Sequence, residues 1–156
     1  MNRLVVAAIV ILGSVPGSAQ ERKASPEPQR VVNVNDAVVR YLAAWNERDP
    51  SRRRDRIARA WTEDGTYVDA HRRGAGHASL DEMIGKAQGQ FPGYQLRLVS
   101  GIESHNGYVR FSWAAGGTEQ APLYIAGTDL AIVAEDGRFK SVVGFADAAP
   151  APVGKQ

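Results

Sequence analysis

The sequence predicts one α+β domain in which three N-terminal helices pack on a curved antiparallel β-sheet. Between residues 35 and 91 apolar residues recur at helical spacing, whereas from Tyr94 onward they alternate with polar residues. The dipeptides Asn106-Gly107 and Asp136-Gly137 are typical of tight hairpin turns. Helices followed by a meander of long strands favour a layered domain with its helices on one face of the sheet, leaving a concavity that suits a small ligand.

The first 19 residues have the three-part layout of a secretory signal peptide. Arg3 precedes the apolar run Leu4–Leu12, and small, turn-prone residues follow up to Ala19, where we expect cleavage. The run is about half the length that a bilayer-spanning helix needs. We therefore expect residues 1–19 to be removed, leaving a periplasmic or secreted protein that is not held in a membrane.

The remaining chain divides into a domain and two polar ends. Residues 20–34 and 148–156 are rich in polar residues and proline, so we expect a disordered linker and a disordered tail around a domain at 35–147. There is no cysteine, and the formal net charge is only +2. Disulfides are thereby excluded, and nucleic-acid binding is not expected, because Arg52–Arg54 lie among acidic residues on the expected solvated face of a helix.

Capping residues and apolar spacing locate the expected helices. Asn35 or Asp36 can cap a first helix, and Asp49-Pro50 has the pattern of an N-cap followed by proline at the first helical position, which opens a second helix reaching Trp61. A strand is expected at 66–70. A third helix is expected to open at a capping box of Ser79 and Glu82, or at a cap near His77, and to end at Pro92-Gly93. Its apolar stripe comprises Leu80, Met83, Ile84, Ala87 and Phe91.

The second half of the chain predicts the sheet. Strands are expected over 94–102, 109–113, 123–133 and 139–145. Within the third of these, Asp129 is in phase with a row of apolar residues, so its carboxyl group is expected to face the core. A buried carboxylate without partners is costly, and Asp129 is therefore expected to be paired or protonated. The alternatives are that the strand ends early or that an arginine or backbone amide satisfies Asp129.

Four segments carry a resemblance to a known superfamily. They are Val39–Asn46, Trp61–Asp69, Gly74–Leu80 and Gly127–Asp129 before Asp136-Gly137. Together they resemble the nuclear transport factor 2-like superfamily, and within it the SnoaL-like and ketosteroid isomerase-like domains, over roughly residues 35 to 147. The resemblance implies a cone-shaped fold with a pocket at its wide end and a homodimer through the open face of the sheet. It does not imply one activity.

Three residues match the catalytic positions of ketosteroid isomerase. Tyr41, before Ala43-Ala44 and Asn46, matches the oxyanion-hole tyrosine; Asp69 matches the catalytic base; and Asp129 matches the protonated aspartate that is the second donor. That enzyme is also a worked example of a carboxylic acid kept neutral by burial. The resemblance implies that Asp69 takes a proton next to a carbonyl group while Tyr41 and neutral Asp129 stabilise the enolate.

Other residues are expected to line the pocket. Tyr67 and His71 share strand parity with Asp69, and His71 is either an acid, base or ligand anchor or an exposed loop residue. Ala70, in place of the proline common in the family, and Arg72-Arg73 are departures that suit ligand anchoring as well as catalysis. The expected ligand-binding residues are Trp45, Trp61, Tyr67, His71, Met83, Phe91, Trp113 and Phe145.

Three functions remain open on the sequence. The first is an isomerase, cyclase or hydratase that needs no cofactor and acts on a small apolar carbonyl compound; the second is a non-catalytic periplasmic binding or accessory domain; the third is a dimeric scaffold with a closed core. Metal and nucleophile chemistry are not expected, because His71, His77 and His105 lack ligand spacing and no cysteine or Gly-x-Ser-x-Gly motif occurs.

Overall fold

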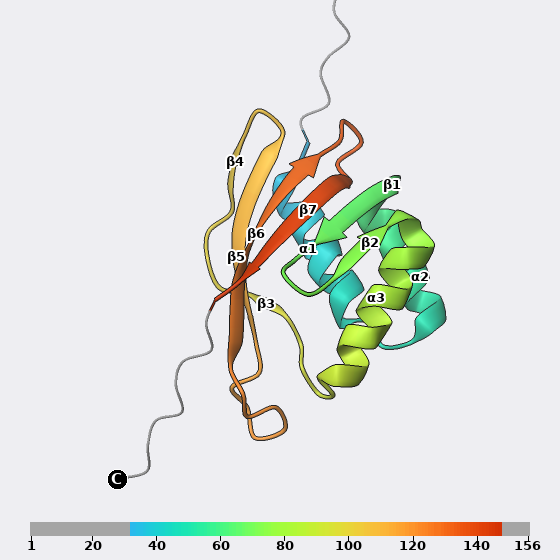
Figure 1. The fold of residues 1–156 in the computed structure, drawn as a ribbon. Helices are drawn as coiled ribbons and strands as arrows, with labels where there is room; N and C mark the ends of the chain where they lie inside the picture. Colours follow the sequence, from blue (N-terminus) through green and yellow to red (C-terminus); the bar gives the residue numbers. More distant parts are fainter. Residues whose placement is uncertain (1–31, 148–156) are drawn as a thin grey trace, which may run out of the picture.

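The computed structural model describes residues 32–147, which form an α+β fold of three helices and a seven-stranded sheet. Figure 1 shows the helices gathered on one side of the sheet, which confirms the predicted fold class. The helices are α1 (Val34–Asn46), α2 (Pro50–Ala60) and α3 (Gly76–Gln90). The strands are β1 (Trp61–Val68), β2 (Arg73–Ala75), β3 (Arg97–Leu98), β4 (Glu103–His105), β5 (Tyr108–Ala115), β6 (Ile125–Val133) and β7 (Phe139–Ala146). The predicted signal peptide, most of the predicted linker and the predicted tail lie outside the described residues.

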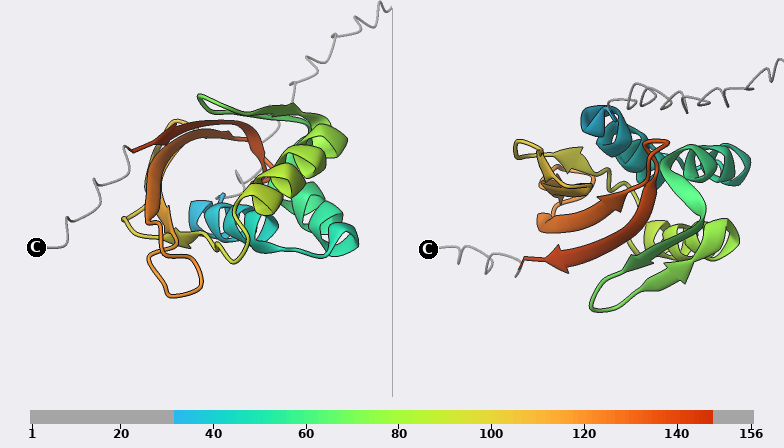
Figure 2. Two further views of the ribbon diagram at one scale, coloured as in Figure 1. Left: turned by 60° about the horizontal axis from the view of Figure 1, so that its bottom comes forward. Right: turned by 90° about the horizontal axis from the view of Figure 1, so that it is seen from above.

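The sheet is curved and mixed. Its strands follow the order β2-β1-β7-β6-β5-β3, and β4 also pairs with β5. All pairs are antiparallel except β1 with β7, which is parallel. Figure 2 shows β5, β6 and β7 as an arc whose open side faces the helices. The inner surface of this arc is where the core and the cavity lie.

The helix starts show which capping signals the chain uses. Asp49 caps α2 as predicted, accepting a hydrogen bond from the backbone N–H of Arg52 at 2.8 Å. The predicted caps of α1 were wrong, because Asn33 occupies that position and accepts from the N–H groups of Asn35 and Asp36. The predicted capping box of α3 was also wrong, since this helix begins at Gly76 with no side-chain cap.

Several strand bounds also differ from the prediction; the strand expected over 94–102, for example, is only Arg97–Leu98. β1 begins at Trp61, which we had placed in the second helix, and its pairing with β7 contains a register shift between Trp61 and Thr66. β6 begins at Ile125 rather than Leu123. Both hairpin predictions are confirmed, with Asn106, Gly107 and Gly137 in the left-handed conformation that such turns require. No helix within residues 32–147 has the length and apolar character needed to cross a membrane.

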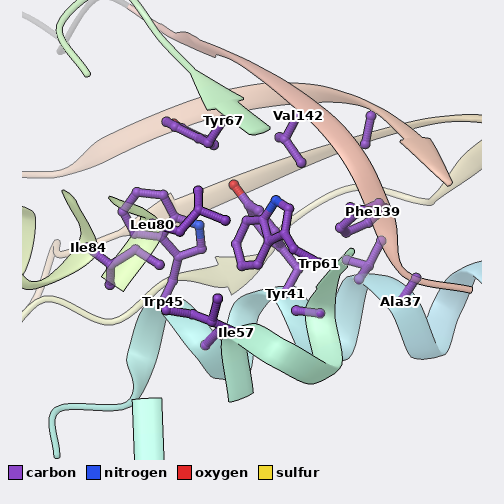
Figure 3. Packing of buried hydrophobic residues seen from close by; sticks show 14 of the residues in the cluster. Ala37, Tyr41, Trp45, Ile57, Trp61, Tyr67, Leu80, Ile84, Phe139 and Val142 are labelled. Atoms are coloured by element: carbon purple, nitrogen blue, oxygen red, sulfur yellow. The ribbon is translucent and has the colours of Figure 1, made fainter. Parts of the chain in front are cut away.

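The core lies between α1 and the inner face of the sheet, with Tyr41 near its centre. The Tyr41 ring contacts Trp61 at a centroid distance of 5.1 Å and Phe111 at 5.4 Å, and both partners are fully buried. Figure 3 shows Tyr41 among Trp45, Trp61 and Phe139 beneath the strands. An aromatic cluster of this kind fixes the position of the Tyr41 ring, and therefore of its hydroxyl group.

Arg53 departs from the expectation of a solvated basic face. Its side chain is buried, and Nε lies 2.6 Å from Oδ1 of Asp81 while Nη1 donates to Oε1 of Gln88 at 3.0 Å. Gln88 in turn donates to the backbone carbonyl groups of Trp45 and Glu47 at the end of α1. This network ties all three helices together next to the cavity.

Candidate functional site

A cavity of about 220 Å³ lies between the C-terminal ends of α1 and α3 and the inner face of the sheet. Aromatic and aliphatic side chains make up most of its wall, with a few polar groups among them. This composition is typical of sites for small, mainly apolar ligands. The lining residues are Tyr41, Trp45, Tyr67, Asp69, Ala70, His71, Arg72, Ala87, Gln88, Phe91, Tyr94, Leu96, Trp113, Ala115, Ile125, Gly144 and Ala146.

Tyr41 and Asp129 form a buried pair at the inner end of this cavity. The Tyr41 hydroxyl donates to Oδ2 of Asp129 at 2.5 Å, a distance expected for a charge-assisted hydrogen bond. Both side chains are almost completely buried, and burial is the main cause that raises the pKa of Tyr41 well above its ordinary value. Tyr41 lines the cavity and Asp129 does not, so the carboxyl group lies behind the phenol and does not face a ligand beside it.

Trp113 holds the other oxygen of the same carboxyl group. Its indole Nε1 donates to Oδ1 of Asp129 at 3.0 Å. Burial raises the pKa of Asp129 to about 6, although the hydrogen bonds from Tyr41 and Trp113 lower it. Desolvation therefore outweighs the two donors. Burial thus shifts the carboxyl group toward its neutral form.

Asp69 directly follows β1 and lines the same cavity. Its Oδ1 accepts from the backbone N–H groups of His71 at 2.7 Å and Arg72 at 2.6 Å. Its Oδ2 accepts from the Tyr67 hydroxyl at 3.0 Å and lies 3.4 Å from Nη1 of Arg72. The turn after β1 thus orients the carboxylate toward the cavity with donors on both oxygens.

Gly144 leaves room for the side chains of Tyr67 and Asp129 to approach each other. It pairs with Asp129 across β6 and β7, and a Cβ atom at this position would lie 2.7 Å from the Tyr67 hydroxyl and 3.0 Å from Oδ1 of Asp129. Tyr67 and Asp129 therefore approach the same point from two sides. Burial is the main cause that raises the pKa of Tyr67, and the charges of Asp129 and Asp69 add to this effect.

The structure places five of the eight predicted ligand-binding residues in the cavity wall. These are Trp45, Tyr67, His71, Phe91 and Trp113. The other three do not line it. Trp61 is fully buried in the core, and Met83 is buried in α3 and faces a second cavity instead.

Phe145 is 61% exposed on the outer face of the sheet, because the β6–β7 pairing shifts register. Ile132 pairs with Ser141 but Val133 pairs with Phe139, so the alternation of β7 reverses at Lys140. Gly144 and Ala146 then face inward, and Phe145 faces outward. The predicted placement of Phe145 in the pocket wall was therefore wrong.

Several wall residues were missed by reasoning from the sequence. Gln88 and Leu96 are positioned by contacts between distant segments: Leu96 exchanges two hydrogen bonds with the Asn46 side chain, at 2.7 and 2.8 Å. No local sequence pattern predicts such contacts between distant segments. Gly144 had a detectable signal, because a glycine inside a strand often marks a place where another group comes close.

Trp45 carries an unused donor at this site. Its indole Nε1 is buried and has no hydrogen-bond partner within residues 32–147, although the ring lines the cavity. A buried donor without a partner costs free energy. Within the same residues no three or more His, Asp or Glu side chains group as metal ligands would.

Comparison with solved structures gives clear matches. A candidate isomerase of the SnoaL-like family from Agrobacterium tumefaciens is 37% identical to this chain; the match covers 73% of this chain and 97% of that one, with a TM-score of 0.68. A protein with a ketosteroid isomerase-like fold from Catenulispora acidiphila, solved with trimethylamine, is 16% identical, with a TM-score of 0.58 over 70% of this chain and 84% of that one.

A candidate SnoaL-like polyketide cyclase from Jannaschia sp. CCS1 is 13% identical, with a TM-score of 0.57 over 78% of this chain and 91% of that one. At such identities the last two similarities show the fold alone. No protein-family model and no curated protein matches the sequence.

Proposed function

Because the chain belongs to the SnoaL-like family of the nuclear transport factor 2-like superfamily, we propose that its cavity binds a small apolar carbonyl compound and moves a proton at the carbon next to the carbonyl. The observation that supports this proposal is that Tyr41 lines an apolar cavity while its hydroxyl is fixed by buried Asp129. A phenol held in a dry site can stabilise the oxyanion that forms when an α proton leaves.

In this mechanism Tyr41 is the group that touches the ligand oxygen, and Asp129 is a positioning residue. When Asp129 is ionised, the Tyr41 proton lies on the hydrogen bond between them. When Asp129 is protonated, it can donate to Tyr41 Oη, and the Tyr41 hydroxyl is then free to turn toward the ligand. Oxyanion stabilisation is therefore expected to be strongest below about pH 6, where Asp129 holds its proton.

Asp69 is the proposed base. A base must reach the proton that it removes, and Asp69 lines the same cavity as Tyr41. No cofactor enters this scheme.

A second function is favoured by one specific observation. Both Asp69 oxygens already accept hydrogen bonds from protein donors, two backbone amides and the Tyr67 hydroxyl, and they contact Arg72, so the carboxylate is held in place rather than left free to reach a substrate proton. Such a cavity would serve a binding protein that holds the same class of ligand without turnover.

Deuterium exchange separates the two functions. The α protons of 2-tetralone in D₂O are followed by NMR with wild-type protein and with the Tyr41→Phe and Asp69→Asn variants. We expect each variant to slow protein-dependent exchange by about a hundredfold or more, as for the loss of one oxyanion donor or of the base. Tyr108→Phe, an exposed tyrosine on β5, is the matched control. Binding of 2-tetralone without exchange above the rate in buffer would establish the binding protein instead.

We also propose that the protein is exported and forms a homodimer. Export is supported by the signal-like pattern of residues 1–19, and sequencing the N-terminus of protein recovered from the periplasm or the medium tests it. The dimer is supported by apolar residues exposed on the outer face of the sheet, among them Val68, Tyr108, Leu130, Ile132 and Phe145.

A further inference from the structure

A second cavity adjoins the first, and its character is different. It is lined by polar and charged groups, which include Arg72, Arg73, Lys86 and Glu82, and it shares His71 and Arg72 with the apolar cavity. An apolar cavity and a cationic one thus share part of their rim. Both lie beside the turn that follows β1 and the exposed side of α3.

Arg72 stands at the boundary between the two cavities. Its guanidinium group lies over the Phe91 ring, 5.8 Å from the centroid, and Phe91 is part of the apolar wall. Nη2 donates to the Gln90 side chain at 3.2 Å, and Nη1 lies 3.4 Å from Asp69. These contacts orient the Arg72 side chain at the rim that the two cavities share.

The charges in the second cavity do not balance. Lys86 pairs with Glu82 at 2.6 Å, and Arg72 pairs with Asp69. Arg73 lines the cavity and forms no salt bridge within residues 32–147. One positive charge therefore remains, which suits a monoanionic group better than a doubly charged phosphate.

Resting on the function proposed above, we infer that the ligand is an amphipathic keto acid. Its carbonyl end enters the apolar cavity beside Tyr41, and its carboxylate lies in the second cavity beside Arg73 and Lys86. The carboxylate would accept two parallel hydrogen bonds from the Arg73 guanidinium group. This ion pair would fix the direction in which the ligand enters. A neutral carbonyl compound would bind by its apolar part alone.

The test compares 5-oxo-5-phenylpentanoate with its primary amide, which has the same shape and no charge. Affinities are measured by calorimetry with wild-type protein, with the Arg73→Gln/Lys86→Gln double variant, and with Arg59→Gln as a control for charge alone. Arg59 is exposed on α2 and lines neither cavity. We expect the acid to bind wild type about threefold to tenfold more tightly than the amide, as for partly exposed ion pairs.

The double variant should lose this preference and keep its affinity for the amide, whereas Arg59→Gln should keep both affinities. Raising the salt from about 0.02 M to about 0.3 M should also reduce the preference in wild type. Equal affinities for acid and amide in wild type would overturn the inference and leave the proposed function standing. Binding of neither compound would overturn both.

Discussion

Gly144 lies directly across the sheet from Asp129, and the absence of a side chain at Gly144 creates the space in which the Asp129 carboxyl and the Tyr67 hydroxyl approach each other. A glycine inside a central strand costs backbone entropy and forgoes packing. Here the space left by the missing side chain is filled by two polar groups, the Asp129 carboxyl from β6 and the Tyr67 hydroxyl from β1. The site therefore depends on Gly144, which has no side chain that could react or form a hydrogen bond.

Gly144→Ala tests this dependence. The new Cβ atom would lie 2.7 Å from the Tyr67 hydroxyl and 3.0 Å from Asp129 Oδ1, so at least one of the two buried side chains must move. We expect a loss of about 1–3 kcal/mol in the free energy of unfolding, as for other overpacked cores, together with weaker ligand binding. Urea denaturation and calorimetry measure the two effects.

Gly89→Ala is the matched control, because a Cβ atom at this position in α3 meets nothing within 4 Å. It should stabilise the protein by about 0.5–1 kcal/mol, since alanine favours a helix interior. Equal stability of Gly144→Ala and wild type would show that the arrangement of Tyr67 and Asp129 does not depend on the absence of a side chain at Gly144.

The protonation of Asp129 gives a prediction for stability against pH. Its pKa is about 6 in the folded protein and 3.8 as an ordinary value, so the folded state binds the proton more tightly. The stability that the neutral group contributes is present below about pH 4 and is lost as the pH rises through 6. The loss should amount to about 3 kcal/mol.

Asp129→Asn removes this titration and adds a constant penalty. An amide has only one acceptor oxygen for the two donors Tyr41 and Trp113, so one donor would face its NH₂ group, at a cost of about 1–3 kcal/mol. The variant should therefore be less stable than wild type at pH 4, and this deficit should shrink or reverse by pH 7.5. A stability difference that does not change between these pH values would contradict an elevated pKa.

Tyr41→Phe should raise the pKa of Asp129 above about 6. The hydrogen bond from Tyr41 favours the carboxylate, and its loss leaves burial opposed only by the bond from Trp113. A ¹³C NMR titration of the Asp129 carboxyl carbon measures the shift directly. Trp113→Phe should move the pKa in the same direction by a smaller amount, because the Trp113 bond is the longer one. A pKa that falls in either variant would contradict this account.

Most of the fold could be predicted from the sequence because its signals are local. Asp49-Pro50 starts a helix, and Asn106-Gly107 forms a hairpin, for reasons contained in a few neighbouring residues. Tyr41, Asp69 and Asp129 were selected through a resemblance together with the phase of one strand. The structure brings Tyr41 and Asp69 to the same cavity and puts Asp129 directly behind Tyr41.

The features that were missed depend on contacts between distant segments. The register shift near Lys140 reverses which residues of β7 face inward and outward, and no residue pattern at that position predicts it. The sequence predicted that Arg53 belongs to a solvated basic run. Its side chain is buried instead, where it pairs with Asp81 and Gln88 on α3. Whether an arginine is buried depends on partners far along the chain, which apolar periodicity does not reveal.

Buried Arg53 gives a further prediction. Arg53→Met would leave Asp81 without its 2.6 Å partner, although Arg54 lies 3.7 Å from the other oxygen. Because an uncompensated buried charge is costly, we expect a loss of about 2–4 kcal/mol in the free energy of unfolding. Adding Asp81→Asn should recover part of it. Additive effects of the two substitutions in a double-mutant cycle would contradict the pairing.

The outer face of the sheet supports the last prediction, which concerns assembly. Leu130 follows Asp129 along β6 and therefore points to the opposite face, where it is 43% exposed and pairs in register with Val143; Phe145 on β7 is 61% exposed. Apolar residues gathered on one exposed sheet face indicate an interaction surface, and a second copy of the chain offers the same surface in return.

We expect wild-type protein to be dimeric in light scattering after size-exclusion chromatography, and Leu130→Lys/Phe145→Lys to be monomeric, because two charges on each face would have to be buried against each other. Val39→Lys changes an equally exposed residue of α1 and should leave the dimer intact. Since the cavity is built on the inner face, the monomeric variant should still bind ligand. Wild-type protein that is monomeric at micromolar concentrations would rule out this assembly, and loss of binding in a folded monomer would show that the cavity depends on the partner.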